Sequence, residues 1–423
     1  MRLRAGIALA LAMLAAGCIG DEGARVRSEG PAQSVLALVG GRVQTEPGAA
    51  AIPNGVVVVE RGVIAAVGPR GEVSVPSGAL VLDCAGATVS AGFWNSHVHF
   101  TQPVWSGAAS APADRLAAAL RAMLTSYGIV GVLDTGSYPS DTLALRQRIE
   151  SGEVPGPAIM TAGGGFAPAG GSPYYLLPTR LPELARAQDA DPMVSTMIAL
   201  GTDAVKLFTG SYAERNRIVI MPVEIVRAAV DAAHRRGKPV VAHPSNSAGA
   251  RAAVDGGVDI LAHTFPSEID GPWDRSLPGR MRERGMALIP TLKLWPYELG
   301  KLGLPPEIIQ RVLGAGEAQV RAFADLGGHI LFGTDVGYMT DYDPTDEYVY
   351  LQRAGLSYAQ ILATLTTTPA QRFGLAARNG RLAAGFDADI AVVEGEPERD
   401  IRALARVRYT LRSGRVIFEG VRR

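Results

Sequence analysis

Apolar and polar positions follow two rhythms along the chain, which predict two kinds of structure. Short valine-rich runs separated by glycine turns predict strands at 35–39, 55–60 and 63–67, and again at 389–393, 407–411 and 415–418. Alternation is poor from Val56 to Val59, which predicts a strand buried on both faces. We expect the two ends of the chain to pair into a small β-sandwich domain.

Between these ends, strand-like runs alternate with helical ones. Leu116, Leu120 and Leu124 recur at helical spacing in a helix predicted at 114–127, and a helix at 222–236 ends at Gly237. Eight strands are predicted, at 91–100, 129–134, 158–162, 203–208, 239–243, 259–263, 286–292 and 330–333. Eight β/α units in series favour an α/β fold, a (β/α)8 TIM barrel, with a doubly wound open sheet as the alternative.

Length and composition support a large core but indicate no charged partner. The chain has 423 residues, of which 47% are hydrophobic and 19% charged, enough for a barrel and a satellite domain. Lys+Arg and Asp+Glu both number 41, and no run of like charge stands out. We therefore expect no nucleic-acid partner.

The N-terminus has the order of a secretory signal: basic Arg2 and Arg4, an apolar run, then Ala15-Ala16-Gly17-Cys18. This resembles a bacterial lipoprotein signal, in which the cysteine is lipidated and becomes the mature N-terminus. Ala15 stands where leucine is usual, which leaves plain secretion open. The apolar run is shorter than the about 20 residues that span a bilayer. We expect a signal peptide at 1–18, lipidation of Cys18, and a periplasmic protein anchored to a membrane.

A second feature, a polar stretch at 19–33, reads as a flexible tether between this anchor and the folded protein. Cys84 is then a lone thiol, so no disulfide can form within the mature chain. The domains that we expect after the tether are 34–90, the first part of the β-sandwich, 91–378, the barrel, and 379–423, the second part of the β-sandwich.

The candidate chemistry begins with two histidines one residue apart. Side chains alternate along a strand, so His97 and His99 point to the same face and can bind one metal ion. That spacing alone leaves a structural pair equally open. In a barrel, functional groups lie at the C-terminal ends of strands. Further metal-binding or charged residues fall at such ends: Lys206, His243, His263 and Asp335.

As a set, these motifs resemble the amidohydrolase superfamily, closest to its imidazolonepropionase-like and prolidase-like (Xaa-Pro dipeptidase-like) members. The resemblance runs from about Ser34 to the C-terminus. It is carried by residues 92–99, Val205-Lys206, Ala242-His243-Pro244, Ala262-His263-Thr264 and Gly333-Thr334-Asp335. Asn95 departs from the family pattern, in which aspartate is commoner.

The resemblance implies a metal-dependent hydrolase barrel with two metal ions. The ligands that it implies are His97, His99 and Asp335 for the first ion, His243 and His263 for the second, and Lys206 bridging both as a carbamate (N6-carboxylysine) formed with CO₂. An ammonium beside two cations would be repelled, whereas a carbamate is an anionic oxygen ligand. Zinc is the default metal for a histidine-rich hydrolytic site.

The reaction that follows is hydrolysis of an amide C–N bond in a small molecule, with a dipeptide or an N-acyl amino acid favoured. Two ions can share a hydroxide nucleophile, and Asp335 would carry its proton to the leaving nitrogen. One alternative is a cyclic-amide hydrolase or heterocycle deaminase with a mononuclear site, where His243 or His263 acts as general acid and base or binds substrate. Another is a non-catalytic periplasmic metal- or ligand-binding lipoprotein. A homo-oligomer also stays open.

Loops after the strands should shape the substrate pocket. The segment 163–175 is glycine-rich and aromatic, includes Tyr174, and lacks the ending of a phosphate-binding loop. Tyr212 could polarise the scissile carbonyl, and Arg215 or Arg217 could hold a substrate carboxylate. Lys293, after the seventh strand, is a further candidate. Each of these could instead be an ordinary loop residue.

Overall fold

The computed structural model describes residues 35–266 and 273–420. The predicted signal peptide at 1–18, its lipidation site Cys18 and the tether at 19–33 lie outside the described residues. In the part that is described, no helix combines the length and apolar character needed to cross a bilayer.

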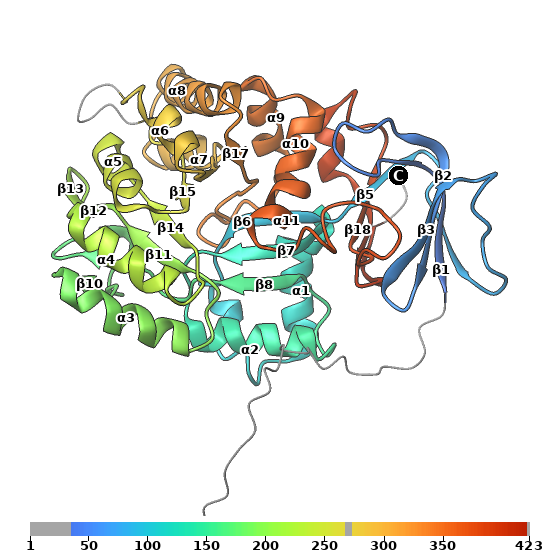
Figure 1. Cartoon of the computed structure of the whole chain (residues 1–423), viewed down its shortest axis with the longest axis horizontal. Coiled ribbons are helices and arrows are strands. Elements are labelled where there is room, and N and C mark those ends of the chain that lie inside the picture. The colour runs from blue at the N-terminus through green and yellow to red at the C-terminus, as the bar shows by residue number, and fades with distance from the viewer. Residues whose placement is uncertain (1–34, 267–272, 421–423) are drawn as a thin grey trace, which may run out of the picture. The chain divides into compact units, whose positions relative to one another are not determined.

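Segments from the two ends of the chain form one mixed sheet. Its strand order is β20-β19-β18-β5-β1-β2-β3, with β4 beside β1. The strands are β1 (Leu36–Val43), β2 (Ile52–Glu60), β3 (Val63–Pro69), β4 (Leu80–Asp83), β5 (Ala87–Ala91), β18 (Ile390–Glu394), β19 (Val407–Arg412) and β20 (Arg415–Glu419). β5 joins the two ends, because it runs antiparallel to β18 with Ala91 opposite Ile390 (Figure 1). The predicted pairing of the two ends is confirmed.

The valine run of β2 is buried on both faces, as its sequence predicts. Val57 and Val59 pack into one apolar cluster, and Val56 and Val58 into another. All four side chains are at most 3% exposed. Because burying a valine contributes about 1.5–3 kcal/mol, this strand anchors the sheet from both sides.

Among the described residues between β5 and β18, eight parallel strands each overlap one of the eight predicted strands. β6 (Phe93–Val98), β7 (Ile129–Asp134) and β8 (Ala158–Thr161) form one sheet. A second sheet contains β11 (Val205–Phe208), β14 (Val240–His243), β15 (Ile260–Ala262), β16 (Ala287–Ile289) and β17 (His329–Ile330). The two sheets meet at both seams through single parallel bridges, Phe166 with Leu207 and Val98 with Val336.

The last of these strands is shorter than predicted, for a reason visible in its hydrogen bonds. β17 ends at Ile330, although the sequence predicts a strand to Gly333. Beyond it, the amide of Phe332 donates to Thr364 O at 3.0 Å, and Phe332 O accepts from the amide of Ser96 at 2.7 Å. At Phe332 the backbone therefore bonds to α10 (Tyr358–Leu365) on one side and to β6 on the other, and the pairing with β16 does not continue.

Helices flank these strands (Figure 1). They are α1 (Ala113–Met123), α2 (Pro139–Glu150), α3 (Ala187–Ala199), α4 (Val223–His234), α5 (Ser247–Gly256), α6 (Leu277–Glu283), α7 (Leu294–Lys301), α8 (Pro306–Asp325), α9 (Thr345–Arg353), α10 (Tyr358–Leu365) and α11 (Thr367–Arg372). The predicted helix at 114–127 is divided, because α1 ends at Met123 and a 3₁₀ turn, η2 (Thr125–Tyr127), leads to Gly128 at φ 78°.

Smaller elements complete the loops after the strands. A hairpin of β12 (Gly210–Glu214) and β13 (Arg217–Ile220) follows β11 directly. The 3₁₀ helix η3 (Tyr174–Leu176) lies between β9 (Ala167–Pro168) and β10 (Glu183–Leu184). The 3₁₀ helices η1 (Pro103–Trp105) and η4 (Ile401–Ala405) lie elsewhere in the chain. The hairpin and η3 carry the tyrosines and arginines predicted to meet the substrate.

Candidate metal centre

Three candidate ligands meet at the ends of β6 and of the segment after β17. The rings of His97 and His99 lie 5.2 Å apart between centroids. Asp335 Oδ1 lies 3.0 Å from His99 Nε2 and 3.4 Å from His97 Nε2. One ligand atom from each residue falls within 4.8 Å of the others. The structure thus brings together the three residues predicted for the first metal ion.

The buried polar atoms of this group fit a metal ion. Both ring nitrogens of His97 and Oδ1 of Asp335 are buried without a hydrogen bond in the described structure. Leaving one such group unsatisfied costs about 1–3 kcal/mol, so several at one point call for a ligand. Burial, reinforced by the charge of Lys206, lowers the pKa of His97 to about 3. The imidazole is then neutral, which is the form that binds divalent cations.

The hydrogen bonds of His99 and His263 determine which ring nitrogen is free. His99 Nδ1 lies 2.7 Å from Gly136 O, and because a carbonyl only accepts, Nδ1 carries the proton. His263 Nδ1 lies 2.7 Å from Thr291 Oγ1, whose own proton goes to Pro290 O at 2.9 Å. Thr291 therefore accepts from His263. In the neutral form of each ring the lone pair is therefore on Nε2, the atom available to a metal. Burial lowers the pKa of His99, but Asp335, whose Oδ1 lies 3.0 Å from His99 Nε2, raises it overall, so a metal ion there would replace a proton.

His243 has the opposite arrangement. Its Nε2 lies 3.1 Å from Ser245 Oγ, and that hydroxyl donates to Gly210 O at 2.9 Å. Nε2 of His243 is therefore the donor, and Nδ1 keeps the lone pair. The His243 ring lies 4.7 Å from that of His263, which lies 4.6 Å from that of His97. The pair predicted for a second ion thus adjoins the first group.

Lys206 reaches the same cluster from β11. It is 2% exposed, and its Nζ lies 5.4 Å from the ring centroid of Phe208, which in turn lies 5.1 Å from His243. Among the described residues, the amine has no hydrogen bond or ion pair. Burial lowers the pKa of Lys206 to about 8, although the charge of Asp335 opposes this. The lowered pKa increases the neutral fraction of the amine, which is the form that reacts with CO₂.

The backbone is strained at several residues that carry or hold these ligands. Non-glycine residues with positive φ include Ser245 (56°), His263 (69°), Thr291 (46°) and Asp335 (61°). Such conformations cost of order 1–3 kcal/mol each and cluster at functional sites. The strain supports a functional reading of this cluster.

Asn95 ties the strand of His97 to the segment of Asp335. Its Oδ1 accepts from the amides of His97 at 3.3 Å and Thr334 at 3.2 Å, and its Nδ2 donates to Thr334 Oγ1 at 2.7 Å. An aspartate could accept the two amides but could not donate to that hydroxyl. The departure from the family pattern therefore adds a hydrogen bond between the two ligand-bearing segments.

Sequence reasoning missed Asp134, which supports His99 from the end of β7. Asp134 is fully buried and accepts from Ser137 Oγ at 2.5 Å and from Thr161 Oγ1 at 2.6 Å. It also accepts from the amide of Gly136, the residue whose carbonyl holds His99. Its position at the end of a predicted strand was the signal available in the sequence.

The predicted substrate residues lie on loops around the cluster. Tyr212 is half-buried in β12, and Tyr174 is half-buried in η3. Arg215 and Arg217 are exposed at the turn of the β12–β13 hairpin, where Arg217 Nε donates to Glu214 Oε1 at 2.9 Å. The described contacts link neither arginine to the histidines. The roles of these four residues stay predictions.

Lys293 is held by the loop that follows Asp335. Its side chain is 5% exposed, and its Nζ lies 2.8 Å from Asp341 Oδ2 and donates to Asp341 O at 3.2 Å and to Asp343 O. Its backbone amide donates to the buried Glu347 at 2.8 Å. Lys293 therefore fastens this loop instead of presenting a free cation to a substrate.

Gly337 is where we expect the loop to tolerate no side chain. An added Cβ would lie 1.7 Å from His99 O, and φ is +99°. Gly337→Ala should therefore destabilise the fold by about 2–4 kcal/mol in urea unfolding, through both the clash and the strained φ. Gly374→Ala is the matched control, because φ is +72° there but no atom lies within 4 Å. Equal losses in the two variants would contradict the close contact at Gly337.

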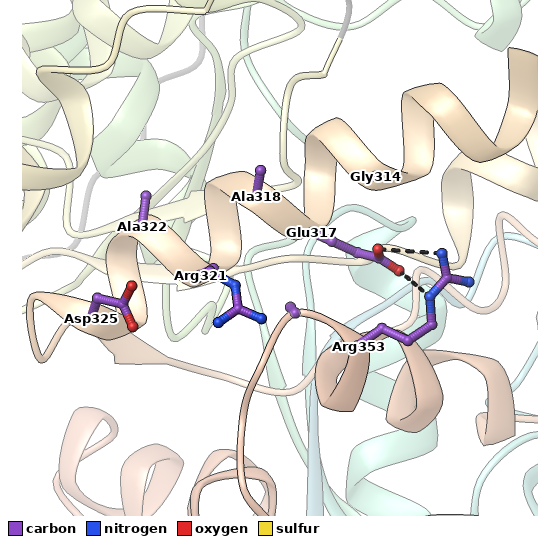
Figure 2. Close-up of a pocket in the computed structure, with 8 residues that line it drawn as sticks. Gly314, Glu317, Ala318, Arg321, Ala322, Asp325 and Arg353 are labelled. Atoms are coloured by element: carbon purple, nitrogen blue, oxygen red, sulfur yellow. Dashed lines mark hydrogen bonds and ion pairs between the residues drawn. The ribbon is translucent and has the colours of Figure 1, made fainter.

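A surface hollow of about 380 Å³ lies between α8 and α9, away from these residues (Figure 2). Figure 2 shows Glu317 and Arg353 pointing towards each other across it, and Arg353 Nε lies 2.9 Å from Glu317 Oε1. None of the candidate ligands lines this hollow. Its chemistry is that of a surface ion pair between helices.

Comparisons with known proteins show the family to which the sequence belongs. The family described as "Amidohydrolase family" matches residues 88–417. The amidohydrolase tasK of Hapsidospora irregularis is 33% identical over 115 residues, 22% of this chain and 12% of that protein. This chain covers less than two thirds of the length of the first curated relatives that it matches.

Solved structures extend the likeness over nearly the whole chain. A candidate prolidase from Bifidobacterium longum has a TM-score of 0.76 and 26% identity, covering 93% of this chain and 97% of its own. A Xaa-Pro dipeptidase crystallised with bound methionine has a TM-score of 0.79 and 23% identity, covering 92% and 100%, and shows the fold alone. Since the family match spans most of the sequence and includes all six candidate ligands, the chain belongs to the amidohydrolase family.

Proposed function

We propose that this protein is a metal-dependent hydrolase that cleaves the amide C–N bond of a dipeptide or an N-acyl amino acid. The observation that carries the proposal is the convergence of His97, His99 and Asp335, with buried atoms that lack other partners. The B. longum candidate prolidase, similar over most of both chains, makes dipeptides ending in proline the first substrates to test.

The fold that we propose for this function is a closed (β/α)8 barrel beside a β-sandwich. The bridges Phe166–Leu207 and Val98–Val336 would close the two parallel sheets into one ring. The candidate ligands then gather at the C-terminal ends of its strands, the usual position of active sites in such barrels. The sandwich would consist of 34–90 and 379–423, around a barrel at 91–378.

The ligand atoms follow from the hydrogen bonds. In the neutral rings Nε2 of His99 and His263 and Nδ1 of His243 would bind, together with the ring of His97 and Oδ1 of Asp335. We propose a carbamate on Lys206 as the oxygen ligand shared by two sites. Divalent ions, for which we propose the zinc that such ligands favour, would acidify water and polarise the amide carbonyl when bound.

The chain's own residues would then manage the proton and the substrate. Asp335 would accept a proton from the attacking water and deliver it to the leaving nitrogen, with His263 beside it. Tyr212 would donate a hydrogen bond to the carbonyl oxygen as negative charge develops there. Arg215 or Arg217 would pair with the substrate carboxylate, and Tyr174 would contact the substrate body.

Removing the metal should abolish hydrolysis and weaken the fold. Dialysis against a chelator is expected to lower turnover of a proline dipeptide to background, and adding Zn²⁺ with bicarbonate should restore it. Metal at a thousand times its Kd should stabilise the protein by about 4 kcal/mol, measured by urea unfolding with and without metal. Elemental analysis should give two ions per chain.

The alternatives give different results in the same assays. One ion per chain with release of ammonia from a heterocycle would indicate a mononuclear deaminase. Two ions with no turnover across a library of dipeptides and N-acyl amino acids would contradict amide hydrolysis and favour a metal-binding lipoprotein. The library should also include cyclic amides, because turnover of these alone would indicate a cyclic-amide hydrolase and not a non-catalytic lipoprotein.

We also propose that the protein is exported and anchored to a membrane through a lipid on Cys18. The support is the order of basic, apolar and small residues before Cys18. Labelling cells with a fatty acid analogue should mark the intact protein but not a Cys18→Ser variant. Equal labelling of both would contradict the anchor.

A further inference from the structure

Four half-buried tyrosines form an aromatic row near Asp335, three in ring contact and the fourth linked to them through Lys301: Tyr174, Tyr175, Tyr338 and Tyr297. The rings of Tyr174 and Tyr175 lie 5.6 Å apart, and those of Tyr175 and Tyr338 lie 5.8 Å apart, both edge to face. Lys301 Nζ lies 5.1 Å from the ring centroid of Tyr338 and 4.0 Å from that of Tyr297. The aromatic row thus joins three segments distant in sequence: η3, the turn after Asp335, and α7.

The row is held close to Asp335 by a tight turn. The amide of Met339 donates to Asp335 O at 3.0 Å, and the amide of Gly337 donates to Met339 O at 3.0 Å. Tyr338 lies inside this turn, so its backbone is held near that of Asp335. Burial is the main cause that raises the pKa of Tyr175, and the charge of Asp335 comes next. Tyr175 therefore lies within electrostatic range of the same carboxylate.

The chemistry of the aromatic row suits an uncharged aromatic ring of a bound ligand. Burial and nearby acidic groups raise the pKa of Tyr175 and Tyr338, so both phenols stay neutral at physiological pH. The cation that touches the row, Lys301, is paired with Glu298 Oε1 at 2.8 Å. Aromatic faces and edges attract another ring in offset or edge-to-face contact, whereas they offer little to a small aliphatic group. A surface of this kind would discriminate between ligands by apolar area and shape.

We propose that the aromatic row is the subsite for a large apolar side chain of the substrate, preferably an aromatic one, adjacent to the scissile amide. Tyr175 and Tyr338 are its specificity-determining residues. This inference rests on the proposed amide hydrolysis, which it deepens by naming the substrate class. A purely structural role, in which the row only packs η3 against the loop after Asp335, predicts no dependence on the substrate side chain.

The test compares two substrates that differ only in that side chain, Phe-Pro and Ala-Pro. The metal-loaded wild type is expected to prefer Phe-Pro by about tenfold or more in kcat/KM. Tyr175→Leu and Tyr338→Leu should each remove most of this preference by raising KM for Phe-Pro more than KM for Ala-Pro, with metal content nearly unchanged. Tyr175→Phe and Tyr338→Phe keep the ring and should retain the preference.

Tyr350→Leu is the matched control, because Tyr350 is also half-buried with a cation, Arg353, 5.4 Å from its ring centroid, but lies on α9. It should leave the preference unchanged. A preference that survives in both leucine variants within twofold, or that is absent in the wild type, overturns the proposal.

A binding measurement separates this inference from the proposed function. Calorimetry of the metal-loaded protein should show L-phenylalanine binding about tenfold more tightly than L-alanine, and Tyr175→Leu should remove the difference. If no amide is hydrolysed but this difference appears, the proposed hydrolysis fails and the subsite stands. Equal binding of the two amino acids to the wild type overturns the subsite whatever the reaction.

Discussion

Asp335→Asn is expected to lower kcat by about 10³- to 10⁴-fold on any amide that the protein hydrolyses. General acid–base catalysis contributes about 10²- to 10⁴-fold, and the substitution would also remove a charged ligand atom from the cluster. Asp335 Oδ1 faces His97 and His99 at 3.4 and 3.0 Å, and an amide there cannot accept and release a proton in the same way. Steady-state kinetics on metal-saturated protein checks the prediction.

The substitution should spare the fold, which makes its kinetic effect interpretable. Asp335 has φ 61°, and asparagine adopts the left-handed region more readily than most residues. Unfolding in urea should therefore change by less than about 1 kcal/mol. Asp346→Asn, at an exposed carboxylate in the first turn of α9, is the control and should keep full activity. Activity of Asp335→Asn within tenfold of the wild type would contradict a catalytic role.

The strand ends could be predicted from the sequence because two local signals agree there. Apolar runs of four to eight residues predict buried strands, and in an α/β barrel the polar residue that ends such a run faces the site. His243 ends β14, and His263 follows β15 directly. Neither placement needed knowledge of distant contacts, so the composition of the cluster was within reach of the sequence.

The orientation of the histidine rings could not be predicted from the sequence, because it depends on hydrogen-bond partners that no sequence pattern marks. Thr291 holds His263 from the end of another strand, and Ser245 holds His243 through a turn with φ 56°. Serine and threonine are common in loops, so their number alone does not predict which one accepts from a histidine. Only the folded backbone shows that their own protons are already donated elsewhere.

Some elements escaped prediction because their sequences contain helix-breaking residues. α3 carries Pro192 inside the helix, and α7 includes Pro296 and Gly300. Proline and glycine predict turns by local preference, and tertiary packing outweighs that preference here. Because α7 was not predicted, nothing in the sequence indicated that Tyr297 and Lys301 join the aromatic row.

The ligand cluster and the aromatic row share one segment, the turn from Asp335 to Met339. Its start bears the carboxylate, its middle bears Tyr338, and Gly337 lies against His99 O. Lys293 fastens the loop that continues from it through Asp341 and Asp343. A displacement of this turn would therefore move the carboxylate that we propose as proton carrier together with the tyrosine that we propose as a specificity residue.

Lys206→Met is expected to abolish activity, by about 10³-fold or more, and to reduce bound metal to at most one ion per chain. The methionine side chain fills the same space but cannot react with CO₂, so the shared anionic ligand is lost. A ¹³C-labelled bicarbonate solution should give a carbamate signal by NMR in the wild type and none in Lys206→Met. Lys238→Met, at a lysine ahead of β14, should retain metal, signal and activity.

Replacing Lys206 by the smaller alanine tests its assignment as a metal ligand more strictly. Lys206→Ala should be as inactive as the methionine variant, but leaves room for an added carboxylate. Because acetate can supply the oxygen ligand that the carbamate would provide, it should restore part of the activity and the second ion in Lys206→Ala. It should do neither in Lys206→Met, where the space is filled. Two ions and near-normal turnover in Lys206→Met, without acetate, would show that the buried amine of β11 is not a ligand.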